Sequence, residues 1–303
     1  MSELSQFGLT AFALIATLFW GLSDVFFKKS TDKNDPYSHL RILFIIGLFM
    51  GGQALYELYK LYAAGGTYSL ETIWIYIPIS FLYIVSMGID FVGYRYLRIS
   101  VGSPIASTSG AMAGILSWLV LKNKMTPIHF IAIMMIFFGL IAMAYFEQKD
   151  FNEGKLGKNE IIGLGAKALI FPVIYSVVDA IATFLDEHYM TSLMTPEEAL
   201  ISFELTFFLV GIMAFIYVKF IRKDKGRMID MSLTLGGIAE TAGQFFYVYA
   251  LSGNGVVTAP IMSLDGVLAS VIGVIFLKEK LGKKQYITIA IIGLGVAILG
   301  FLE

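Results

Sequence analysis

Residues 104–124 read PIASTSGAMAGILSWLVLKNK, and residues 260–280 read PIMSLDGVLASVIGVIFLKEK. One constant shift aligns Pro104 with Pro260, Gly110 with Gly266, and the Leu-Lys-x-Lys that closes each stretch. A nearly equal shift places Trp20-Gly21-Leu22-Ser23-Asp24 on Tyr175-Ser176-Val177-Val178-Asp179. Chance similarity between Gly- and Ala-rich helices is the alternative, but matches at equivalent ends of apolar stretches favour an internal repeat.

The composition of the chain is that of a membrane protein. Of its 303 residues 57% are hydrophobic and 15% are charged, with mean hydropathy +0.76, whereas soluble domains are about 45–50% apolar and about 25% charged. Apolar stretches of about 20 residues suit a helix that crosses a bilayer, and the alternation of a barrel strand is absent. The sequence predicts an all-α polytopic protein with ten transmembrane helices, at 9–28, 40–59, 72–93, 101–121, 127–146, 161–183, 199–219, 231–251, 256–277 and 285–302.

The repeat predicts an inverted topology. Because each copy would hold five helices, an odd number, the second copy enters the membrane from the opposite side, as in many secondary transporters. We expect a first repeat at 1–146, a cytoplasmic linker at 147–160 and a second repeat at 161–303.

Most of the 22 Lys and Arg residues follow the odd-numbered stretches. Positive loops face the cytoplasm, so this count predicts that both termini face outward. The first apolar stretch follows Glu3 rather than a basic segment and is read as a retained helix, not a cleaved signal. We expect a multi-pass protein of a bacterial cytoplasmic (inner) membrane, in contact with membrane lipid.

Several kinds of site are not expected from this sequence. Cysteine is absent, so there is no disulfide framework and no thiolate metal site. A net charge of −1 gives no basic surface for nucleic acid. His39, His129 and His188 have no metal-ligand spacing, so we predict no metal, no cofactor and no catalytic residues. The oligomeric state is left open.

Ionisable side chains inside apolar stretches point to function. One at the centre of a spanning helix costs at least about 2.5–3.5 kcal/mol on the insertion scale. The acidic ones outnumber Lys167, the one cation clearly within a stretch, so some must be protonated, hydrated in a cavity or paired with a cationic ligand. These acidic residues are Asp24, Asp90, Asp179, Glu204, Glu240 and Asp265.

Two aromatic–carboxylate pairs suggest a binding site for an amine. Trp20 and Asp24 are four residues apart, as are Tyr175 and Asp179, so each pair shares a helical face. An aromatic ring beside a carboxylate suits an ammonium group, with a cation–π attraction of about 2 kcal/mol when desolvated. Helix packing or interfacial anchoring is the alternative for the two aromatic residues.

The eighth and ninth stretches each carry a central carboxyl. Glu240, Gln244 and Tyr247 form a polar stripe, and Asp265 has only Ser109 as its counterpart in the first half. Burial favours the neutral form of a carboxyl, so we predict that Glu240 and Asp265 couple proton binding to transport. Alternatively, either one stays protonated and hydrogen-bonds to a neighbouring helix.

The third and seventh stretches give weaker signals. Tyr94 is expected to shape the cavity together with Trp20, Tyr175, Gln244 and Tyr247. Asp90 lies close in sequence to Arg95 and Arg98, which favours an interfacial ion pair. Glu204 lies near its helix end and could extend to the interface.

Three sequence features resemble the EamA-type branch of the drug/metabolite transporter superfamily. They are Trp20-Gly21, the run Phe276-Leu277-Lys278-Glu279-Lys280-Leu281 and the Gly-rich end Gly293-Leu294-Gly295-Val296-Ala297-Ile298-Leu299-Gly300. The family pattern has an acidic residue near the end of the last-but-one helix of each half, which Glu279 matches and Asn123 does not. The resemblance implies alternating access for small polar solutes. It also implies a central cavity lined by helices 1, 3, 4, 6, 8 and 9, with helices 5 and 10 outside it.

The leading hypothesis is a proton-coupled secondary transporter, not an enzyme, for a small amine-bearing metabolite such as an amino acid or quaternary ammonium compound. A neutral nucleoside or sugar is the alternative substrate. An intramembrane aspartyl protease using Asp179 and Asp265 is the alternative of another class, although its Gly-x-Gly-Asp context is missing. A lipid-handling or scaffold protein would need an exposed groove between helices.

Overall fold

The computed structural model describes residues 6–153, 165–253, 255–276 and 282–301. These residues form α-helices joined by short loops, and no strand occurs among them. The elements are α1 (Gln6–Ser30), α2 (Ser38–Ala63), α3 (Glu71–Gly93), α4 (Ile99–Ala106), α5 (Thr108–Leu116), η1 (Ser117–Leu121), α6 (Pro127–Asn152), η2 (Gly165–Leu169), α7 (Ile170–Ser192), α8 (Pro196–Ile216), η3 (Tyr217–Ile221), α9 (Met231–Leu251), α10 (Gly255–Met262), α11 (Asp265–Phe276) and α12 (Lys283–Phe301).

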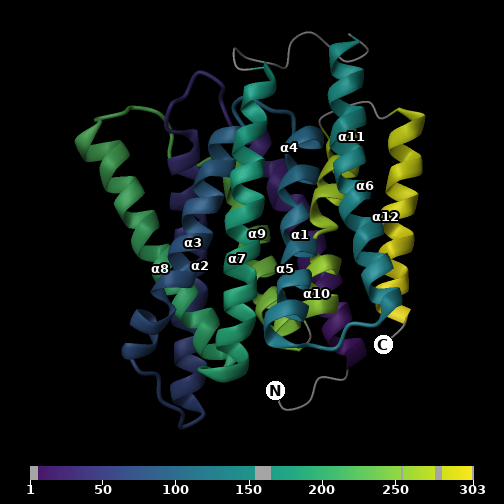
Figure 1. The fold of residues 1–303 in the computed structure, drawn as a ribbon. Helices are drawn as coiled ribbons and strands as arrows, with labels where there is room; N and C mark the ends of the chain where they lie inside the picture. Colours follow the sequence, from purple (N-terminus) through teal and green to yellow (C-terminus); the bar gives the residue numbers. More distant parts are fainter. Residues whose placement is uncertain (1–5, 154–164, 254, 277–281, 302–303) are drawn as a thin grey trace.

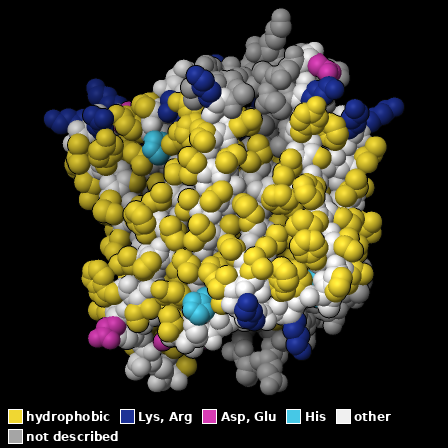
Figure 2. All heavy atoms as spheres, viewed as in Figure 1, with side chains coloured by type: hydrophobic (Ala, Val, Ile, Leu, Met, Phe, Trp, Pro, Cys, Tyr) yellow, Lys and Arg dark blue, Asp and Glu magenta, His cyan; other side chains and the backbone are white. Residues whose placement is uncertain are grey.

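The outer surface of the bundle is apolar. In the view of Figure 2, hydrophobic side chains cover the height of the molecule, and charged groups gather toward its two ends. Trp74, Ile275 and Phe138 are examples of large apolar side chains that are more than half exposed. Such a surface is stable in hydrocarbon and would aggregate in water. Both termini lie at the same end of the bundle (Figure 1).

Seven helical segments of the described chain are long and apolar enough to cross a membrane: Gly8–Ser30, Ser38–Ala63, Glu71–Gly93, Gly102–Leu121, Lys167–Ser192, Pro196–Ile221 and Gly255–Phe276. The predicted ten crossings are therefore only partly confirmed. Pro127–Ala142 is a shorter apolar helix, and α9, which carries Glu240 and Gln244, is not among the seven.

Several predicted boundaries differ from the helices. Helix α7 continues to Ser192, so the predicted end at 183 is wrong by more than two turns. The predicted stretch ended before the charged run Asp186-Glu187-His188. Asp186 and Glu187 are buried, however, so the apolar helix can include them. Lys167 is exposed in η2, before α7 begins, and it lies at the first position of its spanning segment rather than well within it. Helix α6 extends to Asn152, into the predicted linker, and the rest of that linker up to 160 lies outside the described residues.

The two halves of the chain pack against each other in reciprocal pairs. Helix α1 lies against α9, and its counterpart α7 lies against α3. Helices α2 and α8 are also neighbours, as are α6 and α12, which lie together at one edge of the bundle (Figure 1). Because each half buries its surface mainly against the other, neither half is a separate packing unit.

The fourth and ninth predicted helices are both broken. Only Ser107 separates α4 from α5, and Ser263 and Leu264 separate α10 from α11. Each break lies three residues after a proline, Pro104 or Pro260, whose ring and missing N–H disturb helical hydrogen bonding. A broken helix leaves backbone polar groups that must find partners in the protein interior.

Two glycines allow the broken helices to cross in close contact. A Cβ atom on Gly110 would lie 2.2 Å from the carbonyl oxygen of Ala259. A Cβ atom on Gly266 would lie 2.6 Å from the carbonyl oxygen of Ser103. The contacts are reciprocal, since α5 meets α10 and α11 meets α4. This crossing explains why Gly110 and Gly266 occupy aligned positions in the two repeats.

Arg41 joins two loops at one end of the bundle. Its Nε donates to Asp35 Oδ2 at 2.7 Å, its Nη1 donates to the Arg227 carbonyl at 2.9 Å, and its Nη2 donates to Asp224. The loop between α1 and α2 is thereby linked to the loop between α8 and α9. The hydrogen bond from Arg41 holds the pKa of Asp224 below its usual value of 3.8.

This link is expected to weaken in acid. Because the folded-state pKa of Asp224 is lowered, its bond to Arg41 stabilises the protein above the ordinary carboxyl pKa and is lost as pH falls through the lowered value. Thermal unfolding in detergent should give a lower Tm for Asp224→Asn than for the native chain at neutral pH, and the difference should vanish in strong acid. A difference that does not change with pH would refute the assignment.

Helix α8 begins with a capping box. Thr195 Oγ1 accepts from the Glu198 N–H at 3.2 Å, and Glu198 Oε2 accepts from the Thr195 N–H at 2.8 Å. Thr195→Ala should lower the free energy of unfolding by about 1 kcal/mol, because one helix-end donor loses its partner. A fall in Tm for Thr195→Ala, set against the loop variant Thr67→Ala, would measure this, and equal Tm values would contradict it.

Candidate functional site

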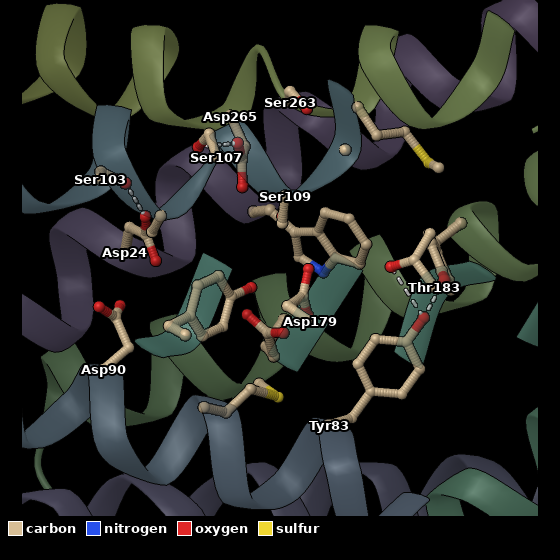
Figure 3. A pocket seen from close by; sticks show the side chains of 18 of the residues that line it. Asp24, Tyr83, Asp90, Ser103, Ser107, Ser109, Asp179, Thr183, Ser263 and Asp265 are labelled. Atoms are coloured by element: carbon tan, nitrogen blue, oxygen red, sulfur yellow. Dashed lines mark hydrogen bonds between the residues drawn. The ribbon is translucent and has the colours of Figure 1, made fainter. Parts of the chain in front are cut away.

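A cavity lies between the two halves of the chain. It is bounded by α1, α3, α4, α5, α7, α9, α10 and α11, with one side chain from α8 (Figure 3). None of the described side chains of α6 and α12 lines it. This arrangement agrees with the lining that the family resemblance implies.

The nine residues predicted to bind substrate or to couple protons all line this cavity. They come from α1, α7, α9 and α11 and from the C-cap of α3, and their roles stay predictions. The predicted substrate-binding residues are Trp20, Asp24, Tyr94, Tyr175, Asp179, Gln244 and Tyr247, and the predicted proton-coupling residues are Glu240 and Asp265.

Asp24 is held by two hydroxyl groups. Tyr94 Oη donates to its Oδ1 at 2.5 Å. Ser103 Oγ donates to its Oδ2, as Figure 3 shows. One partner follows α3 and the other lies in α4, so the carboxyl of α1 connects three segments of the first half. These hydroxyl donors fix the orientation of the Asp24 carboxyl, but they carry no positive charge that would balance a carboxylate.

Asp265 lies at the break in the ninth predicted helix. Its Oδ1 accepts from Ser107 Oγ at 2.5 Å and from the Gly266 N–H at 2.6 Å. The carboxyl thus provides a partner for a backbone donor at the start of α11, where the helix dipole favours negative charge. Ser107 lies at the other break, so this single bond connects the two broken helices (Figure 3).

Glu240 and Asp179 approach the cavity from α9 and α7. Ser23 Oγ donates to Glu240 Oε2 at 2.6 Å, which ties α9 to α1. Asp179 is nearly buried, and the side chains of Ser109 and Tyr175 approach its carboxyl. Each of these carboxyls is therefore oriented by neutral partners.

Asp90 also lines the cavity, contrary to the predicted ion pair. Among the described residues no basic group lies within 4.0 Å of its carboxyl, and only 6% of the residue is exposed. Arg95 instead donates to the Lys33 carbonyl at 3.2 Å and lies over the Tyr96 ring. The structure therefore adds Asp90 to the candidate site.

The carboxyls face aromatic rings from both halves. The Trp20 and Tyr247 rings are 5.0 Å apart, centroid to centroid, and Tyr94 packs edge-on against Phe91. Tyr175 completes the set on the α7 side. The first and sixth predicted helices thus present their aromatic–carboxylate pairs to the same space.

The charge balance of the cavity is strongly acidic. Its lining includes Asp24, Asp90, Asp179, Glu240 and Asp265, and no Lys, Arg or His of the described residues contributes to it. Five ionised carboxyls in a desolvated space would repel one another strongly, so protons or a cationic ligand must balance the charge. No cluster suited to a metal ion occurs in the part of the chain that the structure describes.

Two buried donors in the lining have no protein partner. Trp20 Nε1 and Gln244 Nε2 are buried and form no hydrogen bond within the described residues. Both residues line the cavity, one from α1 and one from α9. A ligand oxygen would satisfy either donor, because an unpaired buried N–H costs about 1–3 kcal/mol.

The sequence did not predict the hydroxyl and phenyl members of the lining. Ser103, Ser107, Tyr83, Thr183 and Phe203 line the cavity, but uncharged residues of these types are ordinary in membrane helices. Glu204 does not extend to the interface as expected. It is fully buried, and neither carboxyl oxygen has a hydrogen-bond partner among the described residues. Glu279 lies outside the described residues.

An apolar helical bundle with a central acidic and aromatic cavity between two repeats defines a membrane transporter. The sequence model of the EamA-like transporter family matches residues 9–145 and 167–301, nearly the whole chain in two repeats. The chain belongs to this family of drug/metabolite-type transporters, and the two-repeat prediction is confirmed. Membership in a transporter family supports a non-enzymatic role.

A solved structure supports the same fold. It is described only as "Crystal structure of protein" and matches with a TM-score of 0.66 over 99% of this chain and 100% of its own. At 14% identity, this likeness shows the fold alone. No curated protein matches the sequence significantly.

Proposed function

We propose that this protein is a proton-coupled secondary transporter that moves a small amine-bearing metabolite by alternating access. The substrate class is an amino acid or a quaternary ammonium compound. The observation that carries the proposal is the cavity itself, where five carboxyls and several aromatic rings meet and where no basic side chain occurs among the described lining residues. A cation is the ligand whose charge and surface match this lining.

The cavity offers separate contacts for the two ends of such a ligand. Asp24 and Asp179 would bind the ammonium group beside Trp20 and Tyr175. The free donors Trp20 Nε1 and Gln244 Nε2 would bind a carbonyl, carboxylate or hydroxyl oxygen. Glu240 and Asp265 would exchange protons, and coupling follows if proton and substrate favour the same inward- or outward-facing state.

The proposed topology is ten crossings in two antiparallel halves. Reciprocal packing of α1 on α9 and α3 on α7 supports it, as does the position of both termini at one end of the bundle (Figure 1). The Lys and Arg distribution favours outward-facing termini in a bacterial cytoplasmic membrane. Reporter fusions at residues 1 and 303 test the orientation, and cytoplasmic reporter activity at both positions would reverse it.

Proteoliposomes test the substrate class. Purified protein would be reconstituted with internal choline, leucine, uridine, glucose or succinate, and counterflow of the same labelled compound would be measured against protein-free vesicles. We expect exchange of choline or leucine. In vesicles without internal substrate, net uptake of the same compound should be accompanied by a change of internal pH reported by a trapped dye. Exchange of uridine or glucose alone would favour the neutral substrate, and exchange of succinate alone would refute the cation site.

A further inference from the structure

A second carboxyl network lies beside the cavity. Asp186 of α7 has no exposed surface, although it belongs to the apolar segment Lys167–Ser192. Tyr76 Oη donates to Asp186 Oδ1 at 2.6 Å, and Tyr83 Oη lies 3.5 Å from Oδ2, at the long limit of a hydrogen bond. Both tyrosines belong to α3, so this carboxyl of the second half is bound by hydroxyls of the first.

A chain of hydroxyl groups leads from Asp186 to the cavity. Tyr83 Oη hydrogen-bonds to Tyr247 Oη. Tyr83 Oη also lies 3.1 Å from Thr183 Oγ1 (Figure 3), so its single proton can be donated either to Thr183 or to Asp186. Tyr83, Thr183 and Tyr247 all line the cavity, whereas Asp186 does not. The Tyr247 ring packs against Trp20, one of the residues proposed to bind the ammonium group. A ligand bound there would therefore lie beside Tyr247, the first residue of the hydroxyl series that leads to Asp186.

Tyrosine hydroxyls and one carboxyl surround Asp186. The titratable groups that face it within the described residues are Tyr76 and Tyr83 from α3, Tyr247 from α9 and the adjacent Glu187. Of the other elements that pack against α7, helices α4, α5, η1 and α10 carry no titratable residue, α8 carries Glu197, Glu198 and Glu204, and η2 carries the exposed Lys167. No salt bridge among the described residues includes Asp186.

Glu187, although adjacent, has a different environment. Its Oε1 accepts from Asn123 Nδ2 at 2.6 Å, from the Gly255 N–H at 2.9 Å and from Ser117 Oγ at 3.0 Å. These three donors, two of which are an amide N–H and a backbone N–H that cannot accept in return, fix the Glu187 carboxyl between η1 and α10. Asp186 instead has only tyrosine hydroxyls, which can donate to a carboxylate or accept from a carboxylic acid.

We propose that Asp186 is a proton-binding site of the transport cycle, reached from the cavity through Tyr247 and Tyr83. A hydronium ion in the cavity gives a proton to the Tyr247 oxygen and becomes water, and Tyr247 releases its own proton to the Tyr83 oxygen. Tyr83 in turn gives its proton to Asp186 Oδ2. One proton is gained by the carboxylate, and only O–H bonds are made and broken. This inference rests on the proposed proton coupling and adds a residue to it.

Infrared difference spectroscopy of the full chain in lipid tests this site without a substrate. The acid-minus-alkaline spectrum should contain a protonated-carboxyl band that is lost in Asp186→Asn and reappears, shifted, in Asp186→Glu. Tyr83→Phe should slow deuterium exchange at that band because the hydroxyl chain is broken. Glu204→Gln removes a buried carboxyl outside the cavity and should leave the band in place. An unchanged spectrum in Asp186→Asn, or unchanged exchange in Tyr83→Phe, would overturn the proposal.

A transport measurement separates this inference from the proposed function. Vesicles carrying a proton gradient should accumulate choline or leucine with the native chain and Glu204→Gln, but not with Asp186→Asn. If neither amine moves with the native chain, the proposed function fails, and the infrared result still decides the Asp186 site. If Asp186→Asn accumulates the amine normally, Asp186 has no part in coupling and the inference fails alone.

Discussion

Neutralising Asp24 or Asp179 is expected to reduce amine transport by about 100-fold or more, because a desolvated charge left without its partner costs about 3–5 kcal/mol. Asparagine keeps the size of the side chain, and the hydroxyls of Tyr94 and Ser103 can still bond to it at position 24. The loss should therefore be one of ligand binding. Counterflow of choline and leucine in proteoliposomes measures it.

A control variant with the same type of acid-to-amide substitution distinguishes loss of ligand binding from misfolding. Glu204→Gln alters a fully buried carboxyl that does not line the cavity. It should transport at the native rate, while Asp24→Asn and Asp179→Asn elute as folded protein in detergent but do not transport. Native rates in both aspartate variants would show that the cation does not bind between these two residues.

The second large effect is expected at the crossing of the broken helices. Gly110→Ala and Gly266→Ala would each place a methyl group within 2.2 Å or 2.6 Å of a backbone oxygen of the opposite half. Overpacking typically costs about 1–3 kcal/mol, and a backbone atom cannot rotate away as a side chain can. Each variant should lose several degrees in Tm, or fail to accumulate as folded protein.

The Gly52→Ala variant is the control for replacing a helical glycine where no close helix contact exists. Gly52 lies inside α2, and no atom of a neighbouring residue lies within 4 Å of the position that an added methyl group would take. Alanine there should therefore stabilise the helix by about 0.5–1 kcal/mol. Thermal unfolding in one detergent compares all three variants. If Gly110→Ala and Gly266→Ala are as stable as Gly52→Ala, the close crossing is not present in the folded protein.

Much of the fold could be predicted from the order of apolar residues. Helix ends at Ser30, Gly93, Leu121 and Leu251 lie within a few residues of the predicted ones. The aligned glycines and prolines indicated a repeat because close helix contact restricts residue size. The break at Ser107 could not be placed, since proline permits both an intact and an interrupted helix in a membrane.

The charged residues of the candidate site were the easiest to predict from the sequence. Asp24 and Asp179 stood out because an acidic residue inside lipid is costly. Their hydroxyl partners carry no such signal. Asp186 was not predicted, because it occurs in a charged run that resembles the end of a membrane helix. Whether such a run is exposed or buried depends on partners such as Tyr76, which is distant in sequence.

Transport by the quadruple variant Asp24→Asn, Asp179→Asn, Glu240→Gln and Asp265→Asn tests the central claim most directly. Counterflow of choline and leucine would be compared with the native chain and with protein-free vesicles, after circular dichroism has shown the same helix content. The cavity account predicts exchange in the native chain and none above the vesicle background in the variant. Equal exchange in both would contradict it.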